Sequence, residues 1–228
     1  MIYAGLALLA VAAVDGVRPL PMRRWLSLTL VGVVIALVGV LAGAYLATGF
    51  ALVIGAAWYL LLPGGRLWVV TALAALSIGA VVWIGATPAS GLLAGVWNLP
   101  SPFGPLPLDL IVLTVGVGAF LLETGNVIVR VALAGEKSWR PDESEPEGAF
   151  KGGRLIGPLE RVIVLLLTLA AAYPLLAAML AAKGIVRFPE ISRDGETGRR
   201  AEYFLVGTLV SWTLGLGGAF LVWWAANA

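Results

Sequence analysis

The chain contains no cysteine and no histidine, and only 12% of its residues are charged. Without cysteine there are no disulfides or thiolate nucleophiles, and without histidine there is no imidazole base. Haem held by these residues and ordinary zinc or copper sites are excluded with them. We therefore expect no cofactor and no metal. The net charge of +2 gives no support for nucleic-acid binding.

Apolar residues take the place of the missing charges, since 60% of the 228 residues are hydrophobic and 29 are glycine. A soluble domain has roughly 25% charged residues, so this composition is typical of a membrane protein. Small residues allow helices to pack closely in lipid, where van der Waals contact must hold them together. The composition predicts an all-α fold, namely a polytopic α-helical membrane protein with one membrane domain over residues 1–228.

Runs of apolar residues predict about eight hydrophobic segments, of which six to eight are true spans. A helix of ~20 apolar residues spans a bilayer, so the runs 26–62 and 155–188 are each long enough for a helical hairpin. We place their turns near Thr48 and Gly49 and at Tyr173 and Pro174. The full set of segments is 1–14, 26–62 (two), 68–87, 109–134, 155–188 (two) and 201–225.

The first segment and two loops complete the layout. Residues 1–14 have basic residues after them and none before, which favours a retained anchor with its N-terminus outside over a cleaved signal peptide. Residues 89–108 contain four prolines and no charge, and we expect them to form an outer loop at the membrane surface. Residues 135–154 are hydrophilic and are expected to form a cytoplasmic loop.

The basic residues test this layout, because cytoplasmic loops collect lysine and arginine. When the segments alternate across the membrane, all fifteen basic residues fall at or near the same face. Treating either hairpin as one span would divide the later loops between the two faces. The distribution therefore predicts both hairpins, with the N- and C-termini outside.

Glu123 lies about midway along the segment 109–134. An ionisable residue within a span costs about 2.5 to 3.5 kcal/mol on insertion scales, so its presence needs a reason. Asn126 and Arg130 follow at spacings that place them on the same helical face, which predicts a polar stripe from mid-membrane to the inner boundary. One interpretation is a site for a proton, an ion or a head group, and the other is an interhelical hydrogen-bond clamp.

Three further motifs supply charged candidates near the inner boundary. They are Glu160 and Arg161 in GRLIGPLERV, Lys183 and Arg187 in AAKGIVRFPE, and Glu202 at the entry of the last span. Taken singly, they are explained by a helix that starts at Gly157 and Pro158 and by anchoring at the boundary. Together with Glu123, Asn126 and Arg130, they predict a mixed-sign binding cavity for the anionic head group of a lipid or for a small anion.

The C-terminal half contains GRLIGPLERVIVLLL, AAKGIVRFPE and AEYFLVGTLVSW. Over about residues 123–215 the chain resembles the end of a family of uncharacterised bacterial integral-membrane proteins, a domain of unknown function. The resemblance implies a multi-pass protein of the bacterial cytoplasmic (inner) membrane, and it brings no activity with it. It also implies that a set of polar residues belongs to the family pattern, namely Glu160, Arg161, Lys183, Arg187, Glu202 and Tyr203.

Three functions fit these patterns. The first is a small transporter or channel, or a lipid- or anion-binding protein, that uses Glu123 and the inner basic residues. The second is a non-catalytic accessory or assembly subunit of a larger membrane complex. The third, a lipid-modifying membrane enzyme, is less favoured, because phosphate chemistry usually needs several carboxylates for Mg²⁺ or a histidine base. The expected partners are membrane lipids, an anionic lipid or small anion, and a membrane-protein partner or a second copy.

Overall fold

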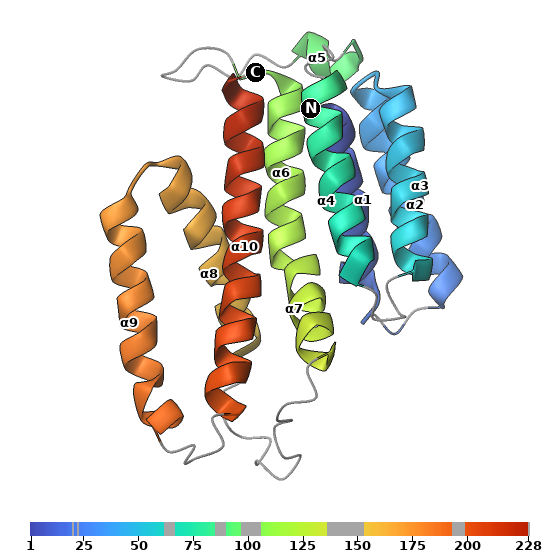
Figure 1. Cartoon of the computed structure of the whole chain (residues 1–228). Coiled ribbons are helices and arrows are strands. Elements are labelled where there is room, and N and C mark those ends of the chain that lie inside the picture. The colour runs from blue at the N-terminus through green and yellow to red at the C-terminus, as the bar shows by residue number, and fades with distance from the viewer. Residues whose placement is uncertain are drawn as a thin grey trace.

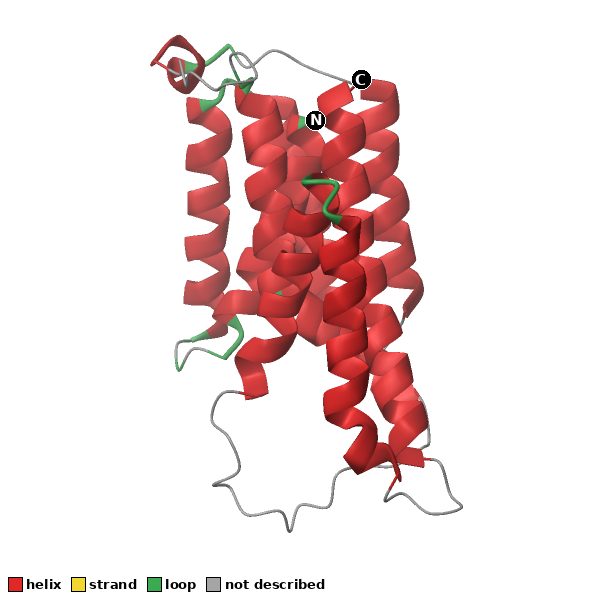
Figure 2. Ribbon diagram, turned by 90° about the vertical axis from the view of Figure 1, so that its left-hand side faces the viewer, coloured by secondary structure: helices red, strands yellow, loops and turns green. Residues whose placement is uncertain are grey.

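The computed structural model of the chain describes residues 1–19, 21, 23–61, 67–84, 90–96, 106–135, 153–192 and 199–227. Every regular element within these ranges is a helix, which confirms the predicted all-α class (Figure 2). In chain order the elements are α1 (Ile2–Val17), α2 (Arg24–Leu41), α3 (Tyr45–Leu61), α4 (Leu67–Gly79) with its π-helical continuation η2 (Ala80–Ile84), α5 (Leu92–Val96), α6 (Leu108–Leu122), α7 (Thr124–Gly135), α8 (Gly153–Leu169), α9 (Tyr173–Ser192) and α10 (Arg199–Asn227).

The long helices run side by side, and the two chain ends lie at the same end of the bundle (Figure 1). Helix α10 lies between two groups of helices. On one side are α1 to α4 and α6, and on the other side α8 packs against α10 and α6 while α9 lies outermost. Helices α6 and α7 follow one another down the middle of the bundle.

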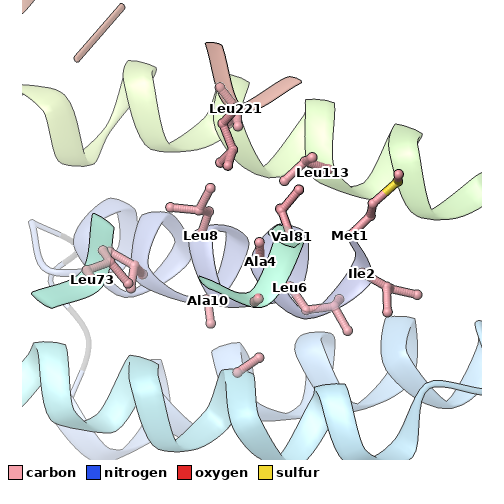
Figure 3. Close-up of a cluster of buried hydrophobic side chains, with 14 of the residues drawn as sticks. Met1, Ile2, Ala4, Leu6, Leu8, Ala10, Leu73, Val81, Leu113 and Leu221 are labelled. Atoms are coloured by element: carbon pink, nitrogen blue, oxygen red, sulfur yellow. The ribbon is translucent and has the colours of Figure 1, made fainter. Parts of the chain in front are cut away.

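Helix α1 lies at the centre of the apolar core. Its side chains are buried along nearly its whole length, and it contacts α2, α3, α4, α6 and α7. Leu8 and Ala4 lie among Leu113 of α6, Val81 of η2 and Leu221 of α10 (Figure 3). A helix that is apolar on every face must be covered on every face. The segment 1–14, the shortest of the predicted ones, therefore forms the middle of the packed structure.

Two glycines allow α1 and α6 to touch at the backbone. A Cβ atom added to Gly5 would lie 2.7 Å from the backbone nitrogen of Leu113, and one added to Gly116 would overlap the carbonyl oxygen of Gly5. Neither position accepts a side chain without moving a helix. This contact is the close packing through small residues that the high glycine content predicts.

The structure confirms both predicted hairpins, but in each the turn lies at a different position from the predicted one. Helices α2 and α3 are joined at Gly43, whose φ of 69° ends α2, and Thr48 lies within α3. The amide of Ala44 donates to the Gly39 carbonyl oxygen, which is the Schellman arrangement that glycine permits after a helix. The predicted turn near Thr48 is therefore wrong, because Gly43 has the conformation that the turn requires.

In the second hairpin, Tyr173 and Pro174 form the first turn of α9 and not the turn between helices. The chain reverses just before them, where Ala171 has a φ of 53°. Proline is well suited to the first turn of a helix, because its missing N–H would be unpaired there in any case. Pro158 differs, since α8 begins at Gly153 and Pro158 lies inside it. The predicted helix start at Gly157 and Pro158 is therefore wrong.

The predicted segment 109–134 forms two helices and not one. Helices α6 and α7 meet at Glu123, and the segments Leu108–Leu122 and Thr124–Ala134 are bent by 44°. Of the two predicted loops, 89–108 includes the short helix α5, and the rest of it lies largely outside the described residues. The loop 135–154 also lies outside them except at its ends.

By length and composition, α10 is long and apolar enough to cross a membrane over Ala201–Asn227. The bent pair α6 and α7 passes the same test if it is counted as one span. The other apolar helices are shorter, with 10 to 17 residues in Ile2–Val17, Trp25–Leu41, Tyr45–Leu61, Trp68–Ile84 and Tyr173–Val186. Within the described residues one or two helices thus meet the criterion, and the six to eight spans stay a prediction.

Candidate functional site

The break between α6 and α7 is the place where polar side chains from other helices converge. Arg161 reaches it from α8 and Ser211 from α10, while Asp15 reaches it from the other side, at the end of α1. Side chains of the apolar core lie around the break, among them Val14 of α1, Leu121 of α6 and Ile128 of α7, and the core extends to Met1 and Ile2 (Figures 1 and 3). The break is therefore a place where polar groups are buried in an otherwise apolar interior.

Arg161 is the largest polar side chain in the interior, with 2% of its surface exposed. Its Nε donates to the Leu121 carbonyl oxygen at 2.8 Å, its Nη2 to Asn126 Oδ1 at 2.6 Å and its Nη1 to Ser211 Oγ at 3.3 Å. In a continuous helix the Leu121 carbonyl would accept the N–H of Gly125. A side chain inserted beside the helical ladder in this way is a known cause of a sharp kink.

Two glycines flank the Arg161 guanidinium, and they differ in the space they leave. A Cβ atom on Gly125 would lie 2.6 Å from Arg161 Nε, so glycine is required on that side. A Cβ atom on Gly157 would lie 3.6 Å from Nη1 and 3.5 Å from Asn126 Oδ1, which is ordinary contact distance. The guanidinium is therefore packed tightly against α7, and on the Gly157 side there is room for a Cβ atom in ordinary contact.

The positive charge of Arg161 has no carboxylate within ion-pair distance among the described side chains. The ion pairs found there join Glu160 to Lys183 and Asp15 to Arg18. The three acceptors of Arg161 are a carbonyl, an amide and a hydroxyl, all of them neutral. A buried charge is costly unless it is paired, and in this respect Arg161 differs from Asp15 and Glu160, which each have a basic partner.

Glu160, the residue before Arg161 in α8, has partners on α9 and α10. Lys183 Nζ lies 2.6 and 2.7 Å from the two carboxylate oxygens, and Trp212 Nε1 donates to Oε1 at 2.8 Å. Lys183 Nζ also lies 5.6 Å from the centre of the Phe204 ring. The side chains of Lys183 and Glu160 are only 25% and 10% exposed, so this pair is a partly buried cross-link between helices.

We expect Lys183→Met to lower the free energy of unfolding by about 2 to 3 kcal/mol, because it leaves the Glu160 carboxylate buried with Trp212 as its remaining partner. The double variant Glu160→Gln/Lys183→Met should regain part of that loss, since a neutral amide still accepts the Trp212 N–H. Denaturant unfolding of the purified protein in detergent measures both. The single variant Glu160→Gln completes the cycle, and a double variant as unstable as the sum of the two single changes would contradict a direct pair.

No family model, no curated protein and no solved structure matches this chain. The resemblance of residues 123–215 to an uncharacterised membrane family therefore stays a prediction. The function is inferred from the geometry of the chain itself.

The candidate residues separate into two networks. Arg161 contacts Asn126, while Glu160 contacts Lys183. The polar stripe on one face is interrupted, because the helix breaks directly at Glu123 and leaves that carboxylate exposed beside Gly16 of α1.

The remaining candidates lie away from these two networks. Arg130 is exposed and donates to the Asn126 carbonyl oxygen of its own helix. Glu202 is exposed in the first turn of α10. Arg187 lies in α9, and its side chain is outside the described part of the chain. Arg130 and Glu202 thus belong to neither network in this structure.

Asp15 is a buried polar residue that was not among the predicted site residues. Its side chain is fully buried, Oδ2 accepts the Trp58 Nε1 hydrogen at 3.0 Å, and Oδ1 lies 3.3 Å from Arg18 Nε. The Arg18 guanidinium in turn lies 5.5 Å from the centre of the Tyr59 ring. One signal was present in the sequence, because Asp15 is the only acidic residue before Asp109. An isolated acid at the end of an apolar segment is a candidate for burial and not only for a loop.

Metal binding has no support among the described residues, where no group of three or more acidic side chains is placed to hold an ion. The Glu160 carboxylate is already held by Lys183 and Trp212. The chemistry that the site offers is therefore that of hydrogen-bond donors and fixed charge, with Arg161 as the strongest donor.

Proposed function

We propose that the chain is a multi-pass protein of the bacterial cytoplasmic membrane. The support comes from the outer surface, where large apolar side chains are exposed on helices other than α1; examples are Val33 and Leu37 on α2, Val53 and Leu60 on α3, Trp83 on η2, Leu166 on α8, Val186 on α9 and Leu209 on α10. Soluble monomers rarely expose contiguous apolar patches of this extent. Between Trp25 and Leu122 the only charged residues are Arg66 and Asp109.

The short helices are compatible with this proposal. A helix of 17 residues such as α3 is ~26 Å long, a few ångströms short of a typical hydrocarbon core of about 30 Å. Such a helix can be accommodated by local thinning of the bilayer. With both chain ends at one end of the bundle, α1 ends and α2 begins at the other end, next to Arg18, Arg23 and Arg24, and we assign that end to the cytoplasm.

Within this membrane domain, we propose that Arg161 binds an anionic group, either the phosphate of a lipid head group or a small phosphate-type solute. The observation that carries the proposal is the buried guanidinium with no carboxylate partner among the described side chains. Guanidinium has five N–H donors, and three are used here. One N–H on Nη1 and one on Nη2 are left, and such a pair suits the two oxygens of a phosphate.

We place this ligand on the Gly157 side of the guanidinium. Gly157 is half-buried, and an added Cβ atom would lie in ordinary contact with Nη1 and Nη2, at 3.6 and 3.9 Å, so the glycine leaves these two nitrogens uncovered by a side chain of its own. The broken helix adds support for transport, because carriers place their substrate sites where a spanning helix is interrupted and its backbone groups face a ligand. A small transporter, or a binding protein for anionic lipid, is therefore the function we favour.

The second candidate, an accessory subunit, is favoured by α9. Large apolar side chains are exposed along this helix, among them Tyr173, Leu175, Ile185, Val186 and Phe188. A partner helix in a larger complex would cover them. Our third prediction, a lipid-modifying enzyme, has no observation in its favour among the described residues.

The test is the anion retained by the purified protein and its loss in Gly157→Leu. The leucine fills the space beside the guanidinium, so we expect retention to weaken at least about tenfold, or about 1.4 kcal/mol. Native mass spectrometry of protein extracted from its own membrane measures lipid retention. Titration with inorganic phosphate in neutral-lipid nanodiscs measures binding of the free anion, and the two arms distinguish a lipid from a solute.

The matched control is Gly184→Leu, because a side chain there would meet nothing within 4 Å. It should retain the anion like the unmodified chain. Equal retention by Gly157→Leu and Gly184→Leu would contradict binding at Arg161. Stoichiometric co-purification of other membrane subunits without any retained anion would favour the accessory role instead.

A further inference from the structure

Two buried oxygen atoms without hydrogen bonds lie together on the α1 side of the break. They are Oδ1 of Asp15 and Oγ1 of Thr124, and neither has a hydrogen-bond partner among the described residues. The Thr124 hydroxyl nevertheless lies close enough to the Asp15 carboxyl to interact with it. Thr124 is fully buried, and the Asp15 side chain is as well. Unpaired buried polar atoms are rare, and each needs an explanation.

The Thr124 hydroxyl can turn to donate to an ionised Asp15 or to accept from a protonated one, so the two oxygens can pair in either state. An ionised Asp15 only accepts hydrogen bonds, whereas a carboxyl group protonated at Oδ1 donates one, and the Thr124 oxygen can accept it. The other carboxyl oxygen, Oδ2, keeps the Trp58 N–H in either state. Trp58 is itself buried, so the carboxyl group is held in place while its charge changes.

We propose that Asp15 is a proton-binding site in which a bound proton and Arg18 are alternative partners of Oδ1. In the ionised state Arg18 Nε lies 3.3 Å from Oδ1. When an O–H bond forms at Oδ1, the proton comes from water and the guanidinium stays charged, so the net charge of the site rises by one. Arg18 is 28% exposed and lies over Tyr59, so its guanidinium can move outward to water while its stem stays packed.

The charged groups around Asp15 are few. Arg130 of α7 acts on it electrostatically, and the exposed Glu123 carboxylate lies against Gly16, the next residue in α1. Helix α4 and η2 contribute no titratable side chain. Helix α2 contributes Arg24, whose side chain is outside the described residues. Glu123 is thus the acidic group nearest to the surface at this site, and it offers a point of entry for the proton.

This site is independent of anion binding at Arg161, which lies on the other side of α7. A proton site beside an anion site would allow uptake of an anion together with a proton. The two proposals can fail separately, because proton binding is measured without any anion present.

The experiment is infrared difference spectroscopy of the full chain in nanodiscs of neutral lipid, recorded as the pH is lowered. We expect the carbonyl stretch of a protonated carboxyl to appear and to be absent from Asp15→Asn. The control Asp109→Asn changes a buried aspartate at the far end of α6 and should keep the signal. Arg18→Gln should show it at higher pH, because the competing charge is removed.

Two further variants keep the proposal falsifiable if Asp15→Asn does not fold. Thr124→Val has nearly the same shape and should shift the stretch to the frequency of a carboxyl without a hydrogen-bond acceptor. Glu123→Gln should keep the signal. A signal unchanged by Thr124→Val and by Arg18→Gln, or lost in Glu123→Gln, would overturn the assignment to Asp15, as would its absence from the unmodified chain.

Discussion

Arg161→Met is expected to lower the free energy of unfolding by about 3 kcal/mol. The change leaves the Leu121 carbonyl, the Asn126 amide oxygen and the Ser211 hydroxyl without the donor that now serves them. A buried polar group that loses its partner costs about 1 to 3 kcal/mol. Removing the desolvated charge offsets part of this loss, so the sum falls below three full penalties.

The matched control is Arg130→Met, since Arg130 is exposed and bonds to its own helix. Its effect should stay within about 0.5 kcal/mol. Unfolding of both variants in the same detergent compares them directly. Phosphate-type anions should stabilise the unmodified chain by mass action and leave Arg161→Met unaffected. Equal stability of the two arginine variants would contradict the role of Arg161 as the cross-link at the break.

The positions of the helices follow from the sequence because they depend on local composition. Apolar runs long enough for two helices, such as 26–62, do contain two, and the bounds of α10 differ from 201–225 by two residues at each end. The exact turns do not follow, because they are set by single backbone conformations. Gly43 at φ 69° was one glycine among many in its run.

The break between α6 and α7 could not be predicted from the local sequence, for a different reason. Residues 109–134 read as one continuous apolar helix, and the bend depends on a guanidinium that arrives from a residue forty positions further along the chain. Gly125 is the local sequence feature that goes with this contact, because a Cβ atom there would lie 2.6 Å from Arg161 Nε. Long-range insertion of this kind cannot be deduced from the periodicity of either helix.

The sequence predicted several residues of the candidate site, but it did not predict which of them contact one another. Glu160 and Lys183 were selected separately as boundary residues, and the structure pairs them. Glu123 was selected because it lies midway along a predicted span. In the structure Glu123 is exposed, and the buried carboxylate on that side of α7 is Asp15. Burial depends on which helices surround a position. Asp15 is buried because α1 is enclosed by its neighbours, which its position near the start of the chain does not indicate.

Gly116→Ala is expected to have a comparable effect on the fold, at about 2 to 4 kcal/mol. The added methyl group would overlap the Gly5 carbonyl oxygen, and neither backbone can turn aside as a flexible side chain can. The helices α1 and α6 must then separate, and α1 is the centre of the core. Overpacking of a tight interior costs about 1 to 3 kcal/mol and at times more. Because α1 and α6 would have to shift along their whole contact, we expect the loss of stability in this variant to lie at the upper end of that range.

Gly118→Ala on the same helix is the matched control, because a Cβ atom there meets nothing within 4 Å. It should stabilise the chain by about 0.5 to 1 kcal/mol, since alanine loses less conformational freedom than glycine in a helix. The two variants differ by two positions and have the same composition, so helix propensity cancels between them. If thermal or denaturant unfolding shows that Gly116→Ala lowers and Gly118→Ala raises the free energy of unfolding, the backbone contact with Gly5 holds α1 against α6. Equal effects of the same sign would mean that the helices can shift at little cost and that the core around α1 is held by its larger side chains.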